Sequence, residues 1–175
     1  MIGKHFSQVD ECLSLVSKDT IERAIVLLDL TRHAAGTVWV AGNGGSAATA
    51  SHFANDLTKI GKVNAIAICD MIPTILAYGN DDGWDRMFAN PLLKYMKPMD
   101  CIVGISCSGN SDNVVEFIRA AGGRRVIGMT GPSPSKMSLL IADPNVLIRA
   151  MSDEITVQED VHSIVCHAIA RSLHG

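Results

Sequence analysis

The sequence lacks the features of a membrane-bound or secreted protein. It has no uninterrupted apolar run near the ~18 residues that a membrane span requires, and residues 1–6 do not resemble the start of a signal peptide. Its five cysteines are scattered without a close pair, at Cys12, Cys69, Cys101, Cys107 and Cys166. Such spacing fits neither a disulfide framework nor a zinc ribbon. We therefore expect a cytoplasmic protein that does not bind membranes.

Charge is also scarce, and it gives no sign of a nucleic-acid partner. Charged residues make up 19% of the 175-residue chain and the formal net charge is −3, so we expect no binding to nucleic acid. A Gly-Lys-Ser/Thr phosphate loop is missing, and Ala47 stands where the dinucleotide fingerprint has its third glycine. We therefore expect no nucleotide cofactor, and a small molecule or a protein as the partner.

Short β-branched runs alternate with helical patterns along the chain. Strands are expected at 37–42, 64–69, 100–105, 124–129 and 145–149. Helices are expected at 46–60, 111–121, 133–141 and 155–173, with short helices across 71–95. This alternation predicts a single α/β domain over residues 1–175, with a doubly wound, five-stranded parallel sheet of the flavodoxin-like type.

An N-terminal helical extension precedes the first strand. Apolar residues recur with helical spacing over 7–35, which predicts one long or broken helix, with Asp19 or Thr20 as an interior cap. Its apolar positions exceed what a small sheet needs for cover. The segment 1–35 therefore either contributes to an interface with a second subunit or simply covers its own domain.

Two loops rich in glycine and serine, 42–46 and 106–111, each follow a predicted strand and open a predicted helix. In an open α/β sheet, ligands bind at the carboxyl ends of the strands, where helix N-termini favour anions. The hydroxyls of Ser46, Ser106, Ser108 and Ser111 can donate to phosphate oxygens. The loops therefore indicate a phosphorylated ligand, although ordinary turns between strands and helices have a similar composition.

His52 and Asp56 lie four residues apart on the predicted helix 46–60. Their side chains share one face, so they could bind one metal ion, act together on one substrate, or form an ordinary exposed pair. His162 lies five residues before His167, about 140° away around a helix. We expect His162 to be a packed or capping residue.

Several strings together resemble the sugar isomerase (SIS) domain family. They are GNGGSA at 42–47, SHFANDL at 51–57, GND at 79–81, SCSGNS at 106–111, and EDVH at 159–162 followed by His167. They span residues 10–173 in the family's order and are most similar to its phosphoheptose isomerase branch. The resemblance implies a flavodoxin-like domain, a homotetramer with sites between subunits, and an aldose–ketose isomerisation that can depend on zinc.

The resemblance also implies which residues bind the phosphorylated sugar. Ser46, Ser106, Ser108 and Ser111 match the family's hydroxyl positions, and Asn43, Gly44 and Gly45 match its backbone contacts. Asp81 matches a contact to sugar hydroxyls, with a turn residue or helix cap as the alternative. Cys107 stands where the family commonly has threonine.

An isomerisation through an enediol needs a base and an acid, and the family uses a glutamate and a histidine. The matching positions are Asp56 and His167, so the carboxylate is one methylene shorter here. Glu159 takes the place of a glutamine that binds substrate or metal in the family. The implied metal set is His52, Asp56, Glu159 and His167. If Glu159 and His167 share one continuous helix they lie about 12 Å apart, which limits this set unless two subunits contribute.

Two classes of function follow from the sequence. The first is a phosphosugar isomerase, with sedoheptulose 7-phosphate as the expected substrate and hexulose, pentose or N-acetylamino-sugar phosphates as alternatives. The second is a non-catalytic SIS protein that binds a phosphosugar or associates with a replication initiator. Retention of His167 together with His52 favours the enzyme.

Overall fold

The computed structural model describes residues 2–173, and a five-stranded parallel sheet forms its centre. The strands are β1 (Thr37–Gly42), β2 (Asn64–Ala67), β3 (Cys101–Ile105), β4 (Arg125–Thr130) and β5 (Val146–Arg149). Their order across the sheet is β2-β1-β3-β4-β5, and each neighbouring pair is parallel. This confirms the predicted flavodoxin-like sheet. The order reverses between β1 and β3, which is where such sheets bind ligands.

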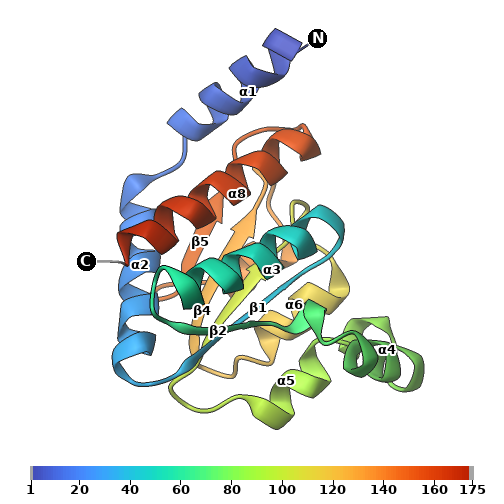
Figure 1. The fold of residues 1–175 in the computed structure, drawn as a ribbon. Coiled ribbons are helices and arrows are strands. Elements are labelled where there is room, and N and C mark those ends of the chain that lie inside the picture. The colour runs from blue at the N-terminus through green and yellow to red at the C-terminus, as the bar shows by residue number, and fades with distance from the viewer. Residues whose placement is uncertain (1, 174–175) are drawn as a thin grey trace.

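Helices cover both faces of the sheet (Figure 1). The elements outside the sheet are α1 (Ile2–Ser14), α2 (Lys18–His33), α3 (Gly44–Lys59), η1 (Ile68–Asp70), α4 (Ile72–Asp81), η2 (Trp84–Arg86), α5 (Ala89–Tyr95), α6 (Asp112–Arg119), α7 (Lys136–Leu140) and α8 (Ile155–Ser172). Helices α2, α3 and α8 pack on one face, and α4 to α7 pack on the other. The prediction of 1–175 as one domain includes Met1, His174 and Gly175, which lie outside the described residues.

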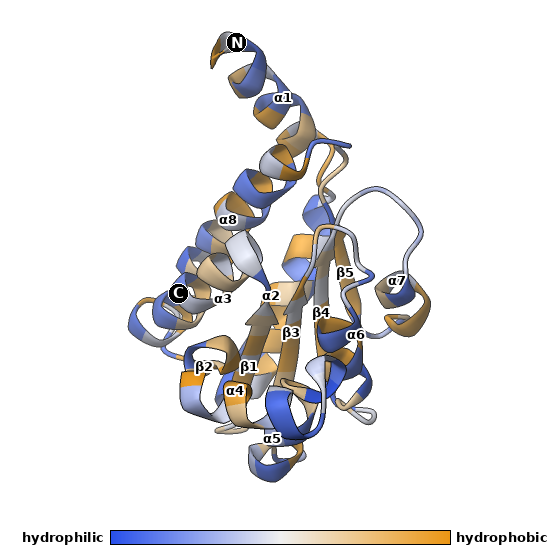
Figure 2. Cartoon of the chain, turned by 90° about the vertical axis from the view of Figure 1, so that its right-hand side faces the viewer, coloured by the Kyte–Doolittle hydropathy of each residue, from blue (hydrophilic) through white to orange (hydrophobic). Residues whose placement is uncertain are grey.

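Burial of both faces explains why the strands read as continuous apolar runs. In β1, Val38 and Val40 pack under α2, α3 and α8, whereas Trp39 and Ala41 face the opposite layer. All four are at most 5% exposed. Figure 2 shows the same pattern as apolar colour along the central strands. In a parallel sheet that helices cover on both sides, neither face of a strand contacts water, so polar residues need not alternate with apolar ones.

The N-terminal segment is a broken helix, one of the two forms that the spacing predicted. It ends at Ser14 and begins again at Lys18. Ser17 caps α2 by accepting a hydrogen bond from the Thr20 amide at 3.3 Å, so the prediction of Asp19 or Thr20 as the cap was wrong. Helix α1 extends beyond the body of the molecule along α8 (Figure 1) and leaves the side chain of Phe6 68% exposed.

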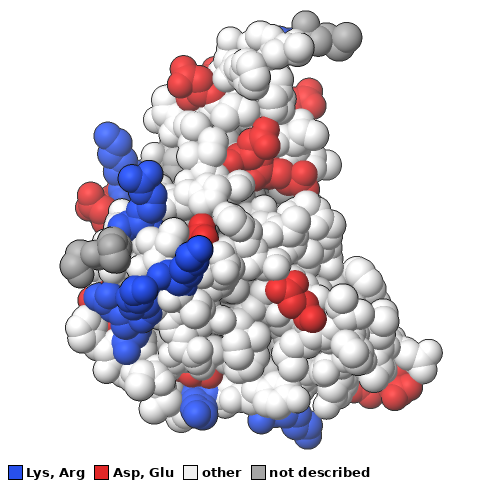
Figure 3. Space-filling view, viewed as in Figure 1, with Lys and Arg blue, Asp and Glu red and all other residues white. Residues whose placement is uncertain are grey.

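Basic side chains form one group on the side of the molecule seen in Figure 3. Several lysines and arginines gather at the left, near the C-terminal end of the chain, whereas acidic side chains are spread over this side, from the region of α1 and α8 to the lower right. No helix within residues 2–173 combines the length and the apolar character needed to cross a membrane.

Candidate active site

The two glycine–serine loops meet in one pocket at the carboxyl edge of the sheet. Because β1 and β3 are neighbours, the loops that follow them lie side by side. The pocket is lined by Asn43, Ser46, Ile105, Ser106, Cys107, Ser108, Ser111, Ile155 and Glu159. The fold thus brings together the four serines that the sequence singled out.

The serine hydroxyls lie close to one another in this pocket. The Oγ of Ser106 is 3.1 Å from the Oγ of Ser111 and 3.4 Å from that of Ser108. Ser46 and Ser106 are buried, whereas Ser108 is exposed at the rim. Ser46 lies in the first turn of α3, and Ser111 is the N-cap of α6. The pocket therefore combines neutral donors with two helix N-termini, an arrangement that suits an anion.

Glycine is required at the start of α3 for two different reasons. Gly44 has a φ of +53°, in the left-handed region that residues with a Cβ rarely adopt. Gly45 packs against the carboxylate of Glu159, and a Cβ there would clash with Oε1. The missing side chain at residue 45 therefore gives Glu159 its place in the pocket.

Glu159 belongs to the serine pocket rather than to a metal cluster within this chain. It lies in helix α8, which also carries His167. Eight residues of continuous helix separate the two by about 12 Å along the axis. The four-residue metal set predicted from the sequence is therefore not assembled within one chain, because α8 is already regular at Glu159.

Cys107 contributes a protonated thiol to the pocket. Burial raises the pKa of this thiol, and the nearby charge of Glu159 raises it further. A thiol with a raised pKa is a weak donor and a poor nucleophile at neutral pH. The side chain therefore contributes to pocket shape and weak hydrogen bonding.

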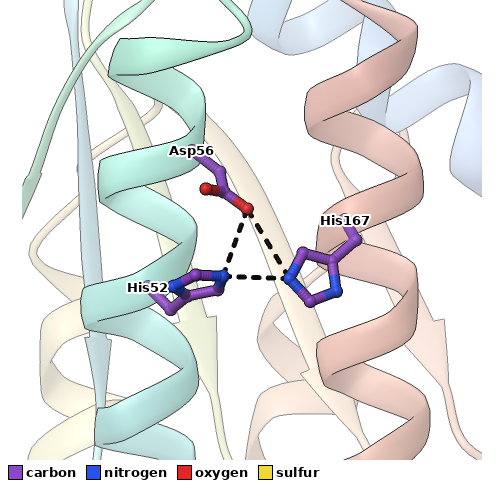
Figure 4. Close-up of side chains that lie close together, drawn as sticks. All are labelled: His52, Asp56 and His167. Carbon is purple, nitrogen blue, oxygen red and sulfur yellow. Dashed lines mark hydrogen bonds and ion pairs between the residues drawn. The ribbon is translucent and has the colours of Figure 1, made fainter.

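Three other side chains form a compact cluster between α3 and α8 (Figure 4). His52 and Asp56 project from α3, and His167 projects from α8 to meet them. The Nε2 atoms of the two histidines are 3.0 Å apart. Oδ2 of Asp56 lies 3.4 Å from Nε2 of His52 and 3.7 Å from Nε2 of His167. The side chain of Asp56 is only 9% exposed, so its carboxylate lies beneath two accessible imidazoles.

This cluster fits a zinc ion. Zinc binds histidine nitrogen and carboxylate oxygen at about 2.0–2.2 Å in a tetrahedron, which sets neighbouring donors roughly 3.3 Å apart. The three distances between the donor atoms of His52, Asp56 and His167 are 3.0, 3.4 and 3.7 Å. These three residues would hold the ion, and a tetrahedral zinc would then have one position for water or substrate, as in catalytic zinc sites.

Asp81 lies apart from the residues that line the pocket. It is the last residue of α4 rather than part of a turn, and it accepts a hydrogen bond from Nδ2 of Asn80 at 2.8 Å. The side chain is exposed and is not among the lining residues. Within this chain, the structure does not bring Asp81 to the site.

Sequence reasoning missed two residues at the pocket. Ile155, the first residue of α8, lines it. Asn113, which is fully buried, exchanges two hydrogen bonds with Asn43. The position of Asn113, two residues after Ser111, was a usable signal, because the side chains of a first helical turn lie close to the loop before it.

Comparisons with known proteins agree with this geometry. Residues 4–131 match the family model of the SIS domain. The chain is 30% identical over 179 residues to a phosphoheptose isomerase of Neisseria gonorrhoeae, covering 96% of this chain and 90% of the relative. It is 36% identical over 181 residues to a phosphoheptose isomerase of Enterobacter sp., covering 97% and 93%.

Solved structures show the same fold over nearly the whole chain. The structure of phosphoheptose isomerase GmhA from Neisseria gonorrhoeae superposes with a TM-score of 0.91 at 29% identity, covering 98% of this chain and 94% of that one. The chain therefore belongs to the SIS domain family, and its sequence relatives place it with that family's phosphoheptose isomerases.

Proposed function

We propose that the protein is an aldose–ketose isomerase that converts sedoheptulose 7-phosphate to an aldoheptose 7-phosphate through an enediol. The observation that carries the proposal is that a serine-lined pocket and an acid–base cluster both lie along α3 and α8. These helices carry Ser46 and Glu159 at the pocket and Asp56 and His167 in the cluster. A non-catalytic SIS protein is not favoured, because relatives that align with nearly the whole chain are named isomerases.

The phosphate is bound by the two loops. Ser46, Ser106, Ser108 and Ser111 donate hydroxyl hydrogens, and the N-termini of α3 and α6 add backbone N–H groups. Glu159 is anionic and cannot accept a phosphate as a neighbour without cost, so the phosphate lies on the serine side of the pocket. The Glu159 carboxylate accepts hydrogen bonds from sugar hydroxyls.

The separation of the two parts suits a long sugar chain. His52 follows Gly45 by seven residues on α3, which is about 10 Å along the helix axis. An open-chain heptose has five or six carbon–carbon bonds of about 1.5 Å between its reacting carbons and the carbon that bears the phosphate. Such a chain, about 6–8 Å long when extended, covers most of this distance. The Asp56 carboxylate and the His167 imidazole both lie close to the His52 ring, with Oδ2 and Nε2 at 3.4 and 3.0 Å from its Nε2.

Asp56 and His167 perform the proton transfers. The Asp56 carboxylate removes a proton from C1 of the ketose and returns one to C2, while His167 donates a proton to the oxygen on C2 and accepts the proton that the oxygen on C1 gives up. A hydrogen bond between the two facing Nε2 atoms requires a proton on one of them. Packing of α3 against α8 sets the reach of the shorter carboxylate in this chain.

Zinc is the proposed cofactor, and His52, Asp56 and His167 would hold it through Nε2, Oδ2 and Nε2. With Nε2 on the ion, His167 would move its proton through Nδ1. When bound, zinc polarises a carbonyl or hydroxyl oxygen as a Lewis acid. Asp56 has a second carboxylate oxygen, Oδ1, which accepts a hydrogen bond from Asn55 at 3.3 Å. With or without the ion, the two imidazoles lie between the Asp56 carboxylate and the solvent, and they orient the substrate there.

We also propose that the protein acts in the cytoplasm as a homotetramer with sites between subunits. Helix α1 supports this, because it extends from the body with Ile2 75% and Phe6 68% exposed. Packing of the α1 segment against another copy would remove this apolar surface from water. In a site formed between two subunits, Glu159 or Asp81 of the neighbouring subunit would join the cluster of His52, Asp56 and His167.

The test is solvent-deuterium incorporation into sedoheptulose 7-phosphate, followed by NMR with added zinc and after treatment with a chelator. Exchange at the carbon beside the carbonyl reports enediol formation even when net conversion is small. The wild-type protein should catalyse exchange, and Asp56→Asn should lower its rate by about 10²–10⁴-fold, as expected for loss of a general base. His167→Ala should show a similar loss while phosphosugar binding remains.

The matched control is Asp29→Asn. Asp29 and His33 form another His–Asp pair four residues apart, on α2, with 3.3 Å between Nδ1 and Oδ2. This variant removes a helical carboxylate beside a histidine away from the site and should exchange like the wild type. Phosphosugar binding without exchange in the wild type, across ketose phosphates of different length, would contradict the enzyme and support a binding protein.

A further inference from the structure

The helices that open on the serine pocket are not capped by their own N-cap side chains. Elsewhere, Ser17 caps α2 and Ser135 caps α7, each by accepting a backbone N–H of the first turn. Asn43 is the N-cap of α3 and makes no such bond. Asparagine is among the strongest N-caps, so its side chain must be engaged by another group.

That group is Asn113 on α6. Nδ2 of Asn43 donates to Oδ1 of Asn113 at 2.8 Å, and Nδ2 of Asn113 donates to Oδ1 of Asn43 at 2.8 Å. The two amides thus form a reciprocal pair that joins the loop after β1 to the helix after β3. The acceptor oxygen that would cap α3 is occupied by this pair.

The orientation of Asn113 is fixed by its surroundings. The residue is 0% exposed. Its Oδ1 also accepts the Val114 amide at 3.0 Å, and its Nδ2 contacts the sulfur of Met87 at 3.5 Å. An inverted amide would place Nδ2 against the Val114 N–H, so only one orientation satisfies the buried groups. Asn43 takes its orientation from this buried partner.

We propose that Asn113 is a positioning residue for the phosphosugar pocket. It keeps the Asn43 side chain off the N-terminus of α3, so that the N–H groups of Gly44, Gly45 and Ser46 are left for the ligand. The first intrahelical bond of α3 runs from the Ala47 amide to the Asn43 carbonyl, and the three preceding N–H groups have no acceptor within the helix. The inference rests on the proposed function only in taking a phosphate as the ligand.

When Asn113 is removed, the Asn43 side chain becomes free to cap α3. The side chain then competes with the phosphate for the same N–H groups. Asn113→Ala should weaken the binding of inorganic phosphate about tenfold, within the range of couplings between residues in contact. KM for sedoheptulose 7-phosphate should rise by a similar factor with kcat little changed, because Asp56 lies about three helical turns from the N-terminus of α3, and His167 lies about two turns beyond Glu159 on α8.

The test is a double-mutant cycle with Asn43, read by calorimetric titration with inorganic phosphate. In an Asn43→Ala background, Asn113→Ala should change phosphate affinity less than twofold, because the competing side chain is already gone. Asn113→Ser provides a milder break of the amide pair should the alanine variant fold poorly. Additive effects of the two substitutions would overturn the inference, and so would an unchanged affinity in both Asn113 variants.

The matched control is Asp100→Asn. Asp100 is 1% exposed and accepts hydrogen bonds from the Thr37 amide, the Trp39 indole and the Lys97 amide, at the amino edge of the sheet. This variant should lose stability to urea but keep phosphate affinity and KM. An equal loss of phosphate affinity in Asp100→Asn would reduce Asn113 to a structural residue and overturn the inference. Absence of turnover in the wild type with phosphate binding intact would contradict only the proposed function.

Discussion

Replacing His162 should change how the stability of the fold depends on pH. This histidine is 0% exposed on α8. Its Nε2 lies 3.2 Å from the Thr130 carbonyl oxygen, and its Nδ1 has no hydrogen-bond partner among residues 2–173. Burial lowers the pKa of His162 from 6.5 to about 4, against a smaller opposing effect of the Thr130 carbonyl. The side chain is therefore neutral in the folded protein at pH 5, whereas in the unfolded chain it is largely protonated.

The direction of the effect follows from proton uptake. As the pH falls from above 6.5 toward 4, the unfolded chain binds a proton at His162 and the folded chain does not. The free energy of unfolding therefore falls across this window and is fully retained above it. With those two pKa values the loss is about 2 kcal/mol at pH 5.

Urea unfolding followed by circular dichroism at pH 7.5 and at pH 5 measures this loss. His162→Gln keeps an N–H donor for the Thr130 carbonyl but has no titrating group. Other carboxylates and histidines titrate in both proteins, so the informative quantity is the difference between the two pH-dependent losses. The wild type should lose about 2 kcal/mol more than His162→Gln. Equal losses in the two proteins would refute the reasoning, and His33→Gln controls for removal of an exposed histidine.

Two further predictions concern the site. Gly45→Ala should raise KM for the sugar phosphate with little effect on stability to urea, because the new Cβ meets only the flexible end of the Glu159 side chain. Gly42→Ala should instead destabilise the fold, because its Cβ would lie 2.6 Å from the Ser46 backbone. Equal effects on KM and on stability in both variants would contradict this. His52→Ala should weaken zinc binding by more than about tenfold. Lowering the pH from 7.5 to 5.5 should weaken zinc binding to the wild type, because histidine ligands must lose their protons to bind the ion. Calorimetric titration with zinc alone measures both effects, and an unchanged zinc affinity in His52→Ala would exclude His52 as a ligand.

The element order was predictable because it depends on local patterns. β-branched runs between helical patterns placed all five strands and fixed the parallel sheet. Element ends were less predictable. The second strand ends at Ala67 instead of residue 69, because Ile68 begins a short 3-10 turn. Ser17 caps α2 earlier than the pattern suggested, since a serine at a helix boundary carries little signal without its backbone geometry.

The pocket was predictable for a similar reason. Once β1 and β3 are parallel neighbours, the loops that follow them must share one sheet edge, so Ser46 and Ser106 come together. Spacing on one helix also placed His52 and Asp56 on the same face. The contact between α3 and α8 could not be predicted from the sequence pattern. Apolar periodicity indicates which face of a helix is buried, but not which helix packs against that face.

The sequence by itself therefore determined the sheet, the two glycine–serine loops at its edge and the pair formed by His52 and Asp56, all of which follow from short-range periodicity and backbone chemistry. The family resemblance grouped His167 with that pair, and the tertiary structure brought it there. Tertiary structure alone decided that Glu159 lies against Gly45 instead, and that Asn43 bonds to Asn113 rather than to its own helix. Each of these contacts joins residues at least 70 positions apart. They depend on the packing of whole helices against one sheet, and no local sequence pattern encodes that packing.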